Sequence, residues 1–360
     1  MKHRVIAVNL PQFHPFKEND EWWGKGFTEW TNVTKGKPRF KGHYQPHLPT
    51  DTGFYDLRLP EARQMQADMA REVGIYGFCY YHYWFNGKQL MERPLSDMLT
   101  LGEPDFPFML CWANENWTRA WDGGEKQILI KQDYTEDDDR NHIRFLCQNY
   151  FNDKRYIRVD GKPVFIIYHS TLIPEIEKSL EVMRDEARKM GEELYLCRFE
   201  SFWEMGEKYL NAGFDAAIDF QPRFNYIASR NFIKRQIEKQ KRAYHIRHEG
   251  VDFYDYKMNV DHALANMDHD YKWFPCITPM WDNSCRRVGM VSSGYINNTP
   301  ELYEYWLRKT LEKAKTFSVD ENFVFINAWN EWAEGNHLEP DIKWGRQYLD
   351  ATKRAIESEL

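Results

Sequence analysis

Short apolar runs alternate along this chain with stretches that have a helical period. The runs are rich in aromatic and β-branched residues, which is typical of buried strands. Helical spacing of apolar residues occurs in three intervening stretches, Leu59–Val73, Pro174–Met190 and Glu301–Phe317. The predicted strands are Val5–Leu10, Gly77–Tyr83, Phe108–Trp112, Val164–Tyr168, Leu194–Phe199, Ala216–Phe220, Phe274–Thr278 and Phe323–Ala328. Eight buried strands that alternate with helices favour a parallel (β/α)8 barrel over an open sheet.

Two connections between the predicted strands are much longer than a barrel requires. The first joins strands one and two and is rich in aromatic residues, glycine, proline and histidine, with little periodicity. The second, Gln221–Lys272, is basic, and its Ile233–His248 part predicts a charged helix. Long loops in a compact barrel commonly form the walls or lid of a cleft. The predicted fold is therefore α/β, a single (β/α)8 TIM barrel with long loops after strands 1 and 6.

The composition narrows the classes of function. Of the 360 residues, 42% are hydrophobic and 29% are charged, as in a globular domain. Aromatic residues reach 16%, with 14 tryptophans and 21 tyrosines, which is more than a core needs, so many are expected at a cleft. The net charge of −7 argues against a nucleic-acid partner, because nucleic-acid binders normally carry a basic face.

Targeting signals are not evident in the sequence. No stretch approaches the roughly 18 consecutive apolar residues of a transmembrane helix. The N-terminal residues lead at once into a strand and do not resemble a signal peptide. The six cysteines fit small buried side chains of a reducing compartment. We therefore expect a cytoplasmic location and no transmembrane segment.

The most informative stretch, Phe323–Gly335, is an apolar strand that runs directly into two carboxylates among tryptophans. Paired acids can move protons around an acetal, and indole faces suit the apolar face of a sugar ring. Residues three apart on a strand point to opposite faces. For Glu331 and Glu334 to cooperate, the chain must leave the strand near Asn330 and turn, which Gly335 would ease. Strand ends of this kind carry the chemistry of α/β barrels.

Other predicted strand ends combine an aromatic ring with an amide, imidazole or carboxylate. Such a combination matches sugars, which present apolar C–H faces edged by hydroxyl groups. We therefore predict an oligosaccharide or polysaccharide partner. The expected substrate-binding residues are Gln12, His14, Glu29, Trp30, His47, Tyr81, His82, Trp84, Trp112, Asn114, Glu115, Trp117, Glu200, Gln221, Trp281, Asn283, Asn327, Trp329 and Asn330.

Each of these groups also has a structural interpretation. Half of the aromatic residues could simply cap the barrel, Glu331 and Glu334 could be solvated, and Glu115 could orient its neighbours. The histidines lack His-x-x-x-His spacing, so we predict no metal site. Neither a Gly-x-Gly-x-x-Gly motif nor a phosphate loop occurs, so we predict no nucleotide cofactor.

Several phrases of the sequence resemble known families. The segment Asn330-Glu-Trp-Ala-Glu-Gly335, followed by His337-Leu-Glu-Pro340, resembles a signature of family 99 glycoside hydrolases, the endo-α-mannosidase and endo-α-mannanase group. The rest of the chain resembles the WbsX-like proteins of O-antigen and polysaccharide gene clusters. The phrases that carry this resemblance are Leu10–Pro15, Trp22–Val33, Gln45–Pro49, Gly53–Arg58, Gly77–Trp84 and Cys111–Arg119.

This resemblance implies one catalytic barrel domain, residues 1–360, and a metal-free retaining mechanism on α-mannose-like glycosides. Glu331 would act on the 2-hydroxyl of the sugar, which displaces the leaving group through a 1,2-anhydro intermediate. Glu334 would protonate the departing oxygen and later activate the acceptor. To hold a proton near neutral pH, Glu334 should lie against an apolar shelf such as Trp332 or Trp329, while Glu331 stays ionised.

Three functions remain open from the sequence. The first is a hydrolase or transglycosidase acting on α-linked, mannose- or rhamnose-like units of a bacterial glycan. The second is a glycosyltransferase of polysaccharide biosynthesis, and the third is a glycan-binding protein without turnover. The hydrolases usually carry histidine at the position of Ala333, so the sugar itself is open. The sequence predicts no particular oligomeric state.

Overall fold

The chain folds around a parallel sheet, described by a computed structural model for residues 3–119, 124–201, 204–224 and 231–359. In sheet order the strands are β12 (Trp273–Phe274), β10 (Ala216–Asp219), β9 (Tyr195–Glu200), β8 (Lys162–Ile167), β4 (Phe108–Trp112), β2 (Gly77–Phe85), β1 (Arg4–Asn9), β15 (Phe323–Ile326) and β13 (Cys276–Ile277). Only Pro275, which has no N–H to donate, separates β12 from β13. Since β12 pairs with β10 and β13 with β15, they act as one strand that closes the barrel.

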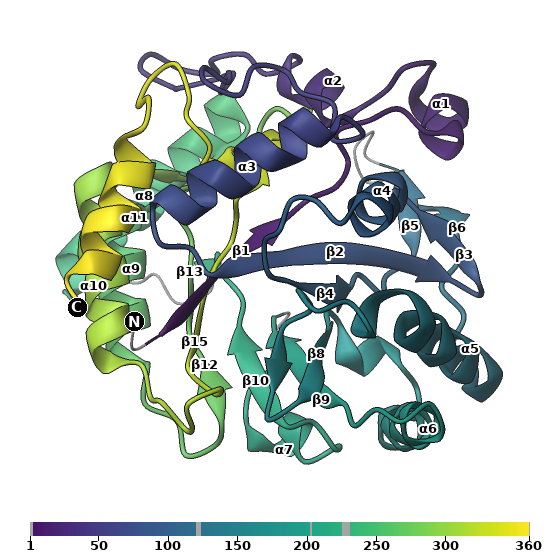
Figure 1. Cartoon of the computed structure of the whole chain (residues 1–360). Coiled ribbons are helices and arrows are strands. Elements are labelled where there is room, and N and C mark those ends of the chain that lie inside the picture. The colour runs from purple at the N-terminus through teal and green to yellow at the C-terminus, as the bar shows by residue number, and fades with distance from the viewer. Residues whose placement is uncertain (1–2, 120–123, 202–203, 225–230, 360) are drawn as a thin grey trace.

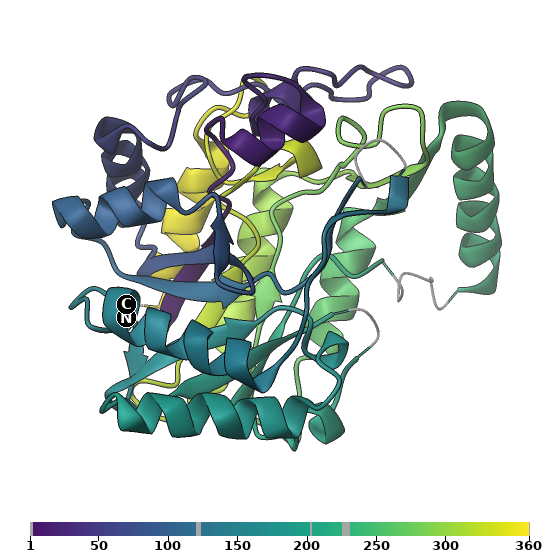
Figure 2. The same ribbon diagram turned by 90° about the vertical axis from the view of Figure 1, so that its right-hand side faces the viewer.

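Helices cover the outside of this barrel (Figures 1 and 2). At least one helix lies between each barrel strand and the next, and the last packs after β15, as in a (β/α)8 barrel. These helices are α3 (Pro60–Glu72), α4 (Arg93–Leu101), α5 (Glu136–Leu146), α6 (Ile176–Lys189), α7 (Glu207–Leu210), α9 (Tyr256–Ala265), α10 (Pro300–Lys313) and α11 (Gln347–Glu357). The predicted fold class is confirmed, and each predicted barrel strand lies within two residues of the observed bounds. Among the described residues, no helix is both long and apolar enough to cross a membrane.

One helix ends earlier than its periodicity predicts. The pattern extends to Phe317, whereas α10 ends at Lys313. Ala314 is extended, with a ψ of 130°. The backbone N–H of Phe317 then donates to the carbonyl of Glu321, so these residues form a turn that leads into β15.

The long connections after the first and sixth barrel strands carry elements of their own. Two helices, α1 (Lys17–Trp23) and α2 (Glu29–Val33), follow β1, and α8 (Phe232–Glu249) follows β10 close to its predicted bounds. Figure 2 shows α8 at the edge of the molecule. The remaining strands are β3 (Lys88–Leu90), β5 (Trp117–Arg119), β6 (Gly124–Ile130), β7 (Arg158–Val159), β11 (Val251–Asp255), β14 (Ser292–Ile296), β16 (Asn330–Glu331) and β17 (Asn336–His337). β11 pairs with β14, which joins the loop after β10 to the loop after β13.

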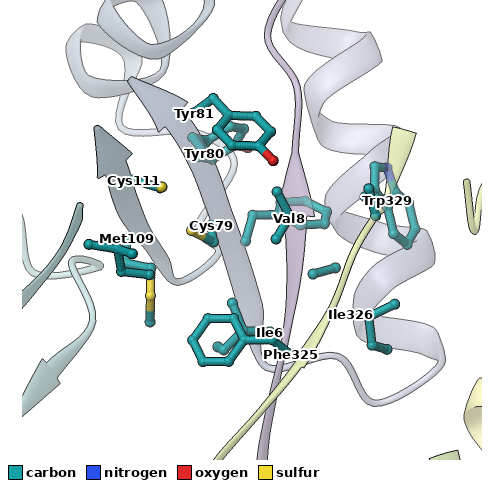
Figure 3. Packing of buried hydrophobic residues seen from close by; sticks show 14 of the residues in the cluster. Ile6, Val8, Cys79, Tyr80, Tyr81, Met109, Cys111, Phe325, Ile326 and Trp329 are labelled. Carbon is teal, nitrogen blue, oxygen red and sulfur yellow. The ribbon is translucent and has the colours of Figure 1, made fainter. Parts of the chain in front are cut away.

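Apolar side chains from neighbouring strands fill the barrel (Figure 3). Ile6 and Val8 of β1 and Phe325 of β15 are fully buried, as are the free thiols of Cys79 and Cys111. Burial of each large apolar side chain contributes about 1.5–3 kcal/mol relative to exposure. This core holds the strand ends in fixed positions, and the loops after those ends form the candidate site.

Candidate active site

The chain turns sharply after β15 and brings Glu331 and Glu334 to one side. It passes through β16, a 3-10 turn at Trp332–Glu334 and then β17, which pairs antiparallel with β16. Gly335 closes the turn with a φ of 53°, and a Cβ there would lie 2.8 Å from the carbonyl oxygen of Asp282. Glycine is therefore required at this position. The turn occurs where the sequence predicted that the chain must leave the strand.

Both glutamates contact Arg286, a residue of the loop between β13 and β14. Arg286 Nη1 donates to Glu334 Oε1 at 2.6 Å. Its Nη2 donates to Glu29 Oε1 at 2.7 Å and lies 3.3 Å from Glu331 Oε2. Glu29, the first residue of α2, is completely buried, and the Glu331 and Glu334 side chains are 7% and 19% exposed. One guanidinium thus serves three shielded carboxylates, which leaves excess negative charge at the site.

Burial is the main influence on the protonation of the pair, and the surrounding charges modify it. Burial, followed by repulsion from Glu334, raises the pKa of Glu331 well above its usual range, and Arg286 opposes the shift only in part. Burial also raises the pKa of Glu334, again against the effect of Arg286. Burial alone would lower the pKa of Arg286, but the carboxylates hold it well above its ordinary value. The pair therefore retains a proton at a higher pH than ordinary glutamates do, as proton transfer near neutral pH requires.

A cavity of about 280 Å³ lies beside the glutamates. This is near the lower end of the range for small-molecule sites, about 300–1,000 Å³. Aromatic rings form much of its wall, namely those of Tyr81, Tyr83, Trp117, Tyr168, Phe220 and Trp281. These residues come from the C-terminal ends of barrel strands and the loops after them, where barrel enzymes keep their active sites.

Several predicted substrate-binding residues do line this cavity. They are Gln12, Tyr81, Glu115, Trp117 and Trp281, together with the two glutamates. Gln12 is 2% exposed, and its amide nitrogen makes no hydrogen bond within the described residues, so it can donate to a bound molecule. Glu115 accepts a hydrogen bond from His169 at 2.8 Å. Glu29 reaches the site indirectly, through Arg286.

A second cavity, of about 460 Å³, is also lined by Trp281. Its lining includes Tyr44, His47 and Trp344, and it has no pair of glutamates. Trp281 therefore contributes both to a cavity that contains the two glutamates and to a larger cavity with aromatic walls.

The structure places three predicted ligands of β2 and β4 away from both cavities. His82 lies 3.0 Å from His142, and the indole of Trp84 donates to Asp138 at 3.0 Å. Trp112 donates to the carbonyl of Trp84 at 3.2 Å. Successive strand residues point to opposite faces, so Tyr81 reaches the barrel mouth while His82 and Trp84 pack under α5. In the structure these three side chains make packing and hydrogen-bond contacts within the protein.

The remaining predicted ligands are also absent from the lining of the 280 Å³ cavity. They are buried or half-buried polar groups that satisfy backbone or side-chain partners and join the loops to the barrel. Burial lowers the pKa of one of them, His14, to about 4, so it is neutral near pH 7. These contacts are His14 with Pro11, Trp30 with Tyr55, His47 with His337, Asn114 with His169, Glu200 with Tyr271, Gln221 with Asp219, Asn283 with Ser293, Asn327 with Gln221, Trp329 with Glu339 and Asn330 with Leu10.

The family follows from comparison with known proteins. The family model described as "Glycosyltransferase WbsX" matches residues 5–352. This chain belongs to the WbsX family. The WxcX proteins of two strains of Xanthomonas campestris pv. campestris, B100 and ATCC 33913, are each 39% identical to it over 354 residues, which is 98% of this chain and 49% of theirs. The chain therefore spans about half the length of the curated relatives it matches.

The fold of this WbsX chain is also found in solved structures. The family 99 endo-alpha-mannosidase from Bacteroides thetaiotaomicron superposes with a TM-score of 0.60 at 14% identity, covering 99% of this chain and 97% of that one. The same enzyme in complex with bis-tris-propane gives 0.56 at 14% identity, covering 99% and 96%. A glycoside hydrolase-like protein gives 0.60 at 15% identity, covering 98% and 93%. At these identities the likeness shows a shared fold.

Two features of the WbsX site differ from the sequence prediction. Arg286 was not among the predicted site residues, although it follows two of them, Trp281 and Asn283, within a few residues. The expected tryptophan shelf for Glu334 is wrong. The indoles of Trp329 and Trp332 both donate to Glu339, at 3.0 and 2.6 Å. Burial in the cluster around Arg286 raises the pKa of Glu334 instead, and it raises that of Glu331 as well.

Proposed function

We propose that the protein is a retaining glycoside hydrolase or transglycosidase that acts on α-linked, mannose- or rhamnose-like units of a bacterial oligosaccharide or polysaccharide. The observation that carries the proposal is the pair Glu331 and Glu334, which share Arg286 beside an aromatic-walled cavity. The fold likeness to family 99 hydrolases is consistent with it. A substrate longer than one sugar would use both cavities, with one ring against Trp281.

The proposed chemistry has two steps. Glu331 takes the proton of the sugar 2-hydroxyl, whose oxygen attacks the anomeric carbon while the glycosidic bond breaks. Glu334 gives its proton to the departing oxygen. In the second step Glu334 takes a proton from water or from a sugar hydroxyl, which attacks the anomeric carbon and opens the anhydro ring. The 2-oxygen regains its proton from Glu331. Two displacements at one carbon retain its configuration.

The position of Arg286 places a condition on the roles proposed for Glu331 and Glu334. Arg286 lies closer to Glu334 than to Glu331, at 2.6 against 3.3 Å, and so favours the ionised form of Glu334. The proposed first step requires the proton on Glu334 and the charge on Glu331. Substrate binding must therefore move the shared proton, which two carboxylates on one guanidinium can do at little cost. The opposite assignment, with Glu331 as the acid, is the direct competitor.

A comparison of natural α-glycosides with substrates that have an activated leaving group distinguishes which glutamate is the acid. We expect Glu334→Gln to lose most activity on natural α-glycosides but much less on substrates with an activated leaving group, because the latter need no acid. Glu331→Gln should lose both activities. If the activated leaving group rescues Glu331→Gln instead, the roles are reversed. A substrate that lacks the 2-hydroxyl should be inert, and its turnover would rule out participation of that group.

The family description favours a second candidate function, a glycosyltransferase. Such an enzyme would consume a nucleotide sugar in the presence of a glycan acceptor and would leave the α-linked oligosaccharides intact. A glycan-binding protein would bind the oligosaccharides with the same affinity in wild type and Glu331→Gln and would turn over neither class of donor.

A further inference from the structure

Two pairs of buried histidines have ring nitrogens 3.0 Å apart. One pair is His82 with His142, and the other is His47 with His337. The first lies among aromatic rings, with Trp84 stacked on His142 at 4.6 Å between ring centres. A neutral N–H···N hydrogen bond accounts for such a pair. The second pair has different neighbours, and these suit a cation.

The surroundings of His337 fix the position of its lone pair. Its Nδ1 lies 2.8 Å from the carbonyl oxygen of Glu339. A carbonyl only accepts, so Nδ1 carries the proton and Nε2 of the neutral ring carries the lone pair. That Nε2 faces Nδ1 of His47 and lies 3.8 Å from Asp341 Oδ2. A backbone carbonyl on the far nitrogen is the arrangement that orients metal-binding histidines.

The carboxylate of Asp341 completes the group. Its Oδ1 accepts a hydrogen bond from the Trp344 N–H at 2.6 Å. Its Oδ2 makes no hydrogen bond of normal geometry among the described residues, although the Tyr44 hydroxyl is close enough to interact with the carboxylate. The side chain is only 1% exposed. A buried carboxylate oxygen without a full partner is costly, and a cation would satisfy it.

We infer that His47, His337 and Asp341 bind a divalent transition metal, for which zinc suits the ligand set best. Their ligand atoms all lie within 4.8 Å of one another, and within the described part of the chain no other group of three does so. Tetrahedral zinc bonds of about 2.0–2.2 Å hold ligands about 3.4 Å apart, so Asp341 Oδ2 would move inward slightly. Because His47 and Tyr44 line the 460 Å³ cavity, an ion and a water ligand can arrive from it.

The proposed ion has a structural role in this position. His47 belongs to the long loop after β1, whereas His337 and Asp341 follow the 3-10 turn that ends at Glu334. β17, which contains His337, pairs with β16, which contains Glu331. The ion would therefore clamp the first loop to the backbone that positions Glu331. This role does not depend on the reaction that the site performs.

Metal binding can be measured directly on tag-free protein that has been stripped with a chelator and dialysed. We expect wild type to bind one equivalent of Zn²⁺ by elemental analysis, with a melting temperature at least about 3 °C higher when zinc is in large excess over its dissociation constant. Co²⁺ in its place should give the strong visible absorption of a tetrahedral site. Asp341→Asn, which keeps the size of the side chain and removes its charge, and His47→Gln should each bind at least tenfold more weakly.

The matched control is His142→Gln, which alters the other histidine pair and should leave the zinc affinity of the folded protein unchanged. Circular dichroism would verify the fold of each variant. Wild type that binds no zinc, or that binds it without a thermal shift, would overturn the inference. So would equal binding by wild type and both site variants, since that pattern indicates surface histidines. Wild type alone gives a decisive answer even if a variant fails to fold.

Discussion

Two buried carboxylate sites adjoin the turn at Trp332–Glu334, and they differ in charge balance and in access. Glu339 accepts four hydrogen bonds from neutral donors, at 2.8 Å from Gln66, 3.0 Å from Trp329, 2.8 Å from Tyr55 and 2.6 Å from Trp332. It is 2% exposed, and neither described cavity includes it. Glu331 and Glu334 instead share one guanidinium with a third acid and line a cavity.

The contrast separates an acid that holds the fold from acids that can react. Every lone pair of Glu339 that faces the protein has a donor, so its proton equilibrium affects stability and little else. The Glu331 and Glu334 pair lacks enough positive charge and faces open space, so its protons can pass to a bound molecule. Acids with a perturbed pKa that line a cavity, as Glu331 and Glu334 do, mark functional sites, whereas burial by itself does not.

The largest expected effect is the loss of activity in Glu331→Gln. We expect a rate at least about 1,000-fold below wild type on a natural α-glycoside, because the amide cannot accept the proton. The free energy of unfolding should stay equal or rise, since one repelling carboxylate is removed. Steady-state kinetics and urea unfolding on the same preparation measure both. A loss of activity that only follows a loss of stability would make Glu331 a structural acid like Glu339.

The opposite result is expected from Glu339→Ala. Four donors lose their acceptor inside the protein, and each unsatisfied group costs about 1–3 kcal/mol, so we expect a loss of at least about 4 kcal/mol in the free energy of unfolding. Urea unfolding measures this loss, with Glu72→Ala as an exposed control that should change by less than about 0.5 kcal/mol. A change in Glu339→Ala as small as that in the control would show that the hydrogen bonds contribute nothing net.

The pH dependence of stability sharpens the same distinction. Burial raises the pKa of Glu339 to about 7, against the effect of its four donors. The folded state therefore binds the proton more tightly than the unfolded state, whose pKa is about 4.3. The stabilising contribution is complete below about pH 4 and is lost as the pH rises through about 7.

This direction of the pH dependence predicts a measurable difference in stability between wild type and Glu339→Gln. From pH 5 to pH 8 the free energy of unfolding of wild type should fall relative to the variant by about 2–3 kcal/mol. Comparing the two proteins cancels the titration of unrelated groups. Parallel curves would mean that Glu339 titrates at an ordinary pH in the folded protein.

A smaller effect is expected from Arg286→Met, which tests the shared cation. Removal of a nearby positive charge raises the pKa of a carboxylate, so both limbs of the pH–rate profile should move to higher pH by about 1–2 units. Arg287→Met is the matched control, because Arg287 acts on Glu334 more weakly than Arg286 does. A profile unchanged in Arg286→Met would remove Arg286 from the account of the site.

The barrel could be predicted from the sequence because its strands are buried on both faces and are therefore continuous apolar runs, as in Phe108–Trp112. Because both faces of these strands are buried, the sequence does not show which residues face the mouth of the barrel. Tyr81 lines the cavity and His82 does not, yet both are buried and both suit a sugar site. Sequence pattern alone cannot assign the two faces of such a strand.

The turn that carries Glu331 and Glu334 could be predicted because the two acids and Gly335 are close in sequence. Arg286 could not, because it reaches Glu331 from an irregular loop with no periodicity to place it. The tryptophan shelf failed for a related reason. The indole of Trp332, which was expected beside Glu334, donates to Glu339 instead, and only the fold reveals this partner.

The most direct test of the central claim follows the anomeric signals by time-resolved NMR. Wild type, Glu331→Gln and Glu334→Gln would be incubated with α-mannosyl and α-rhamnosyl oligosaccharides and, separately, with nucleotide sugars plus glycan acceptors. We predict that wild type forms new reducing ends or transfer products with retained α configuration, and that both variants lose this activity on natural oligosaccharides. Products of inverted configuration, consumption of nucleotide sugars alone, or full activity in either variant would contradict the account.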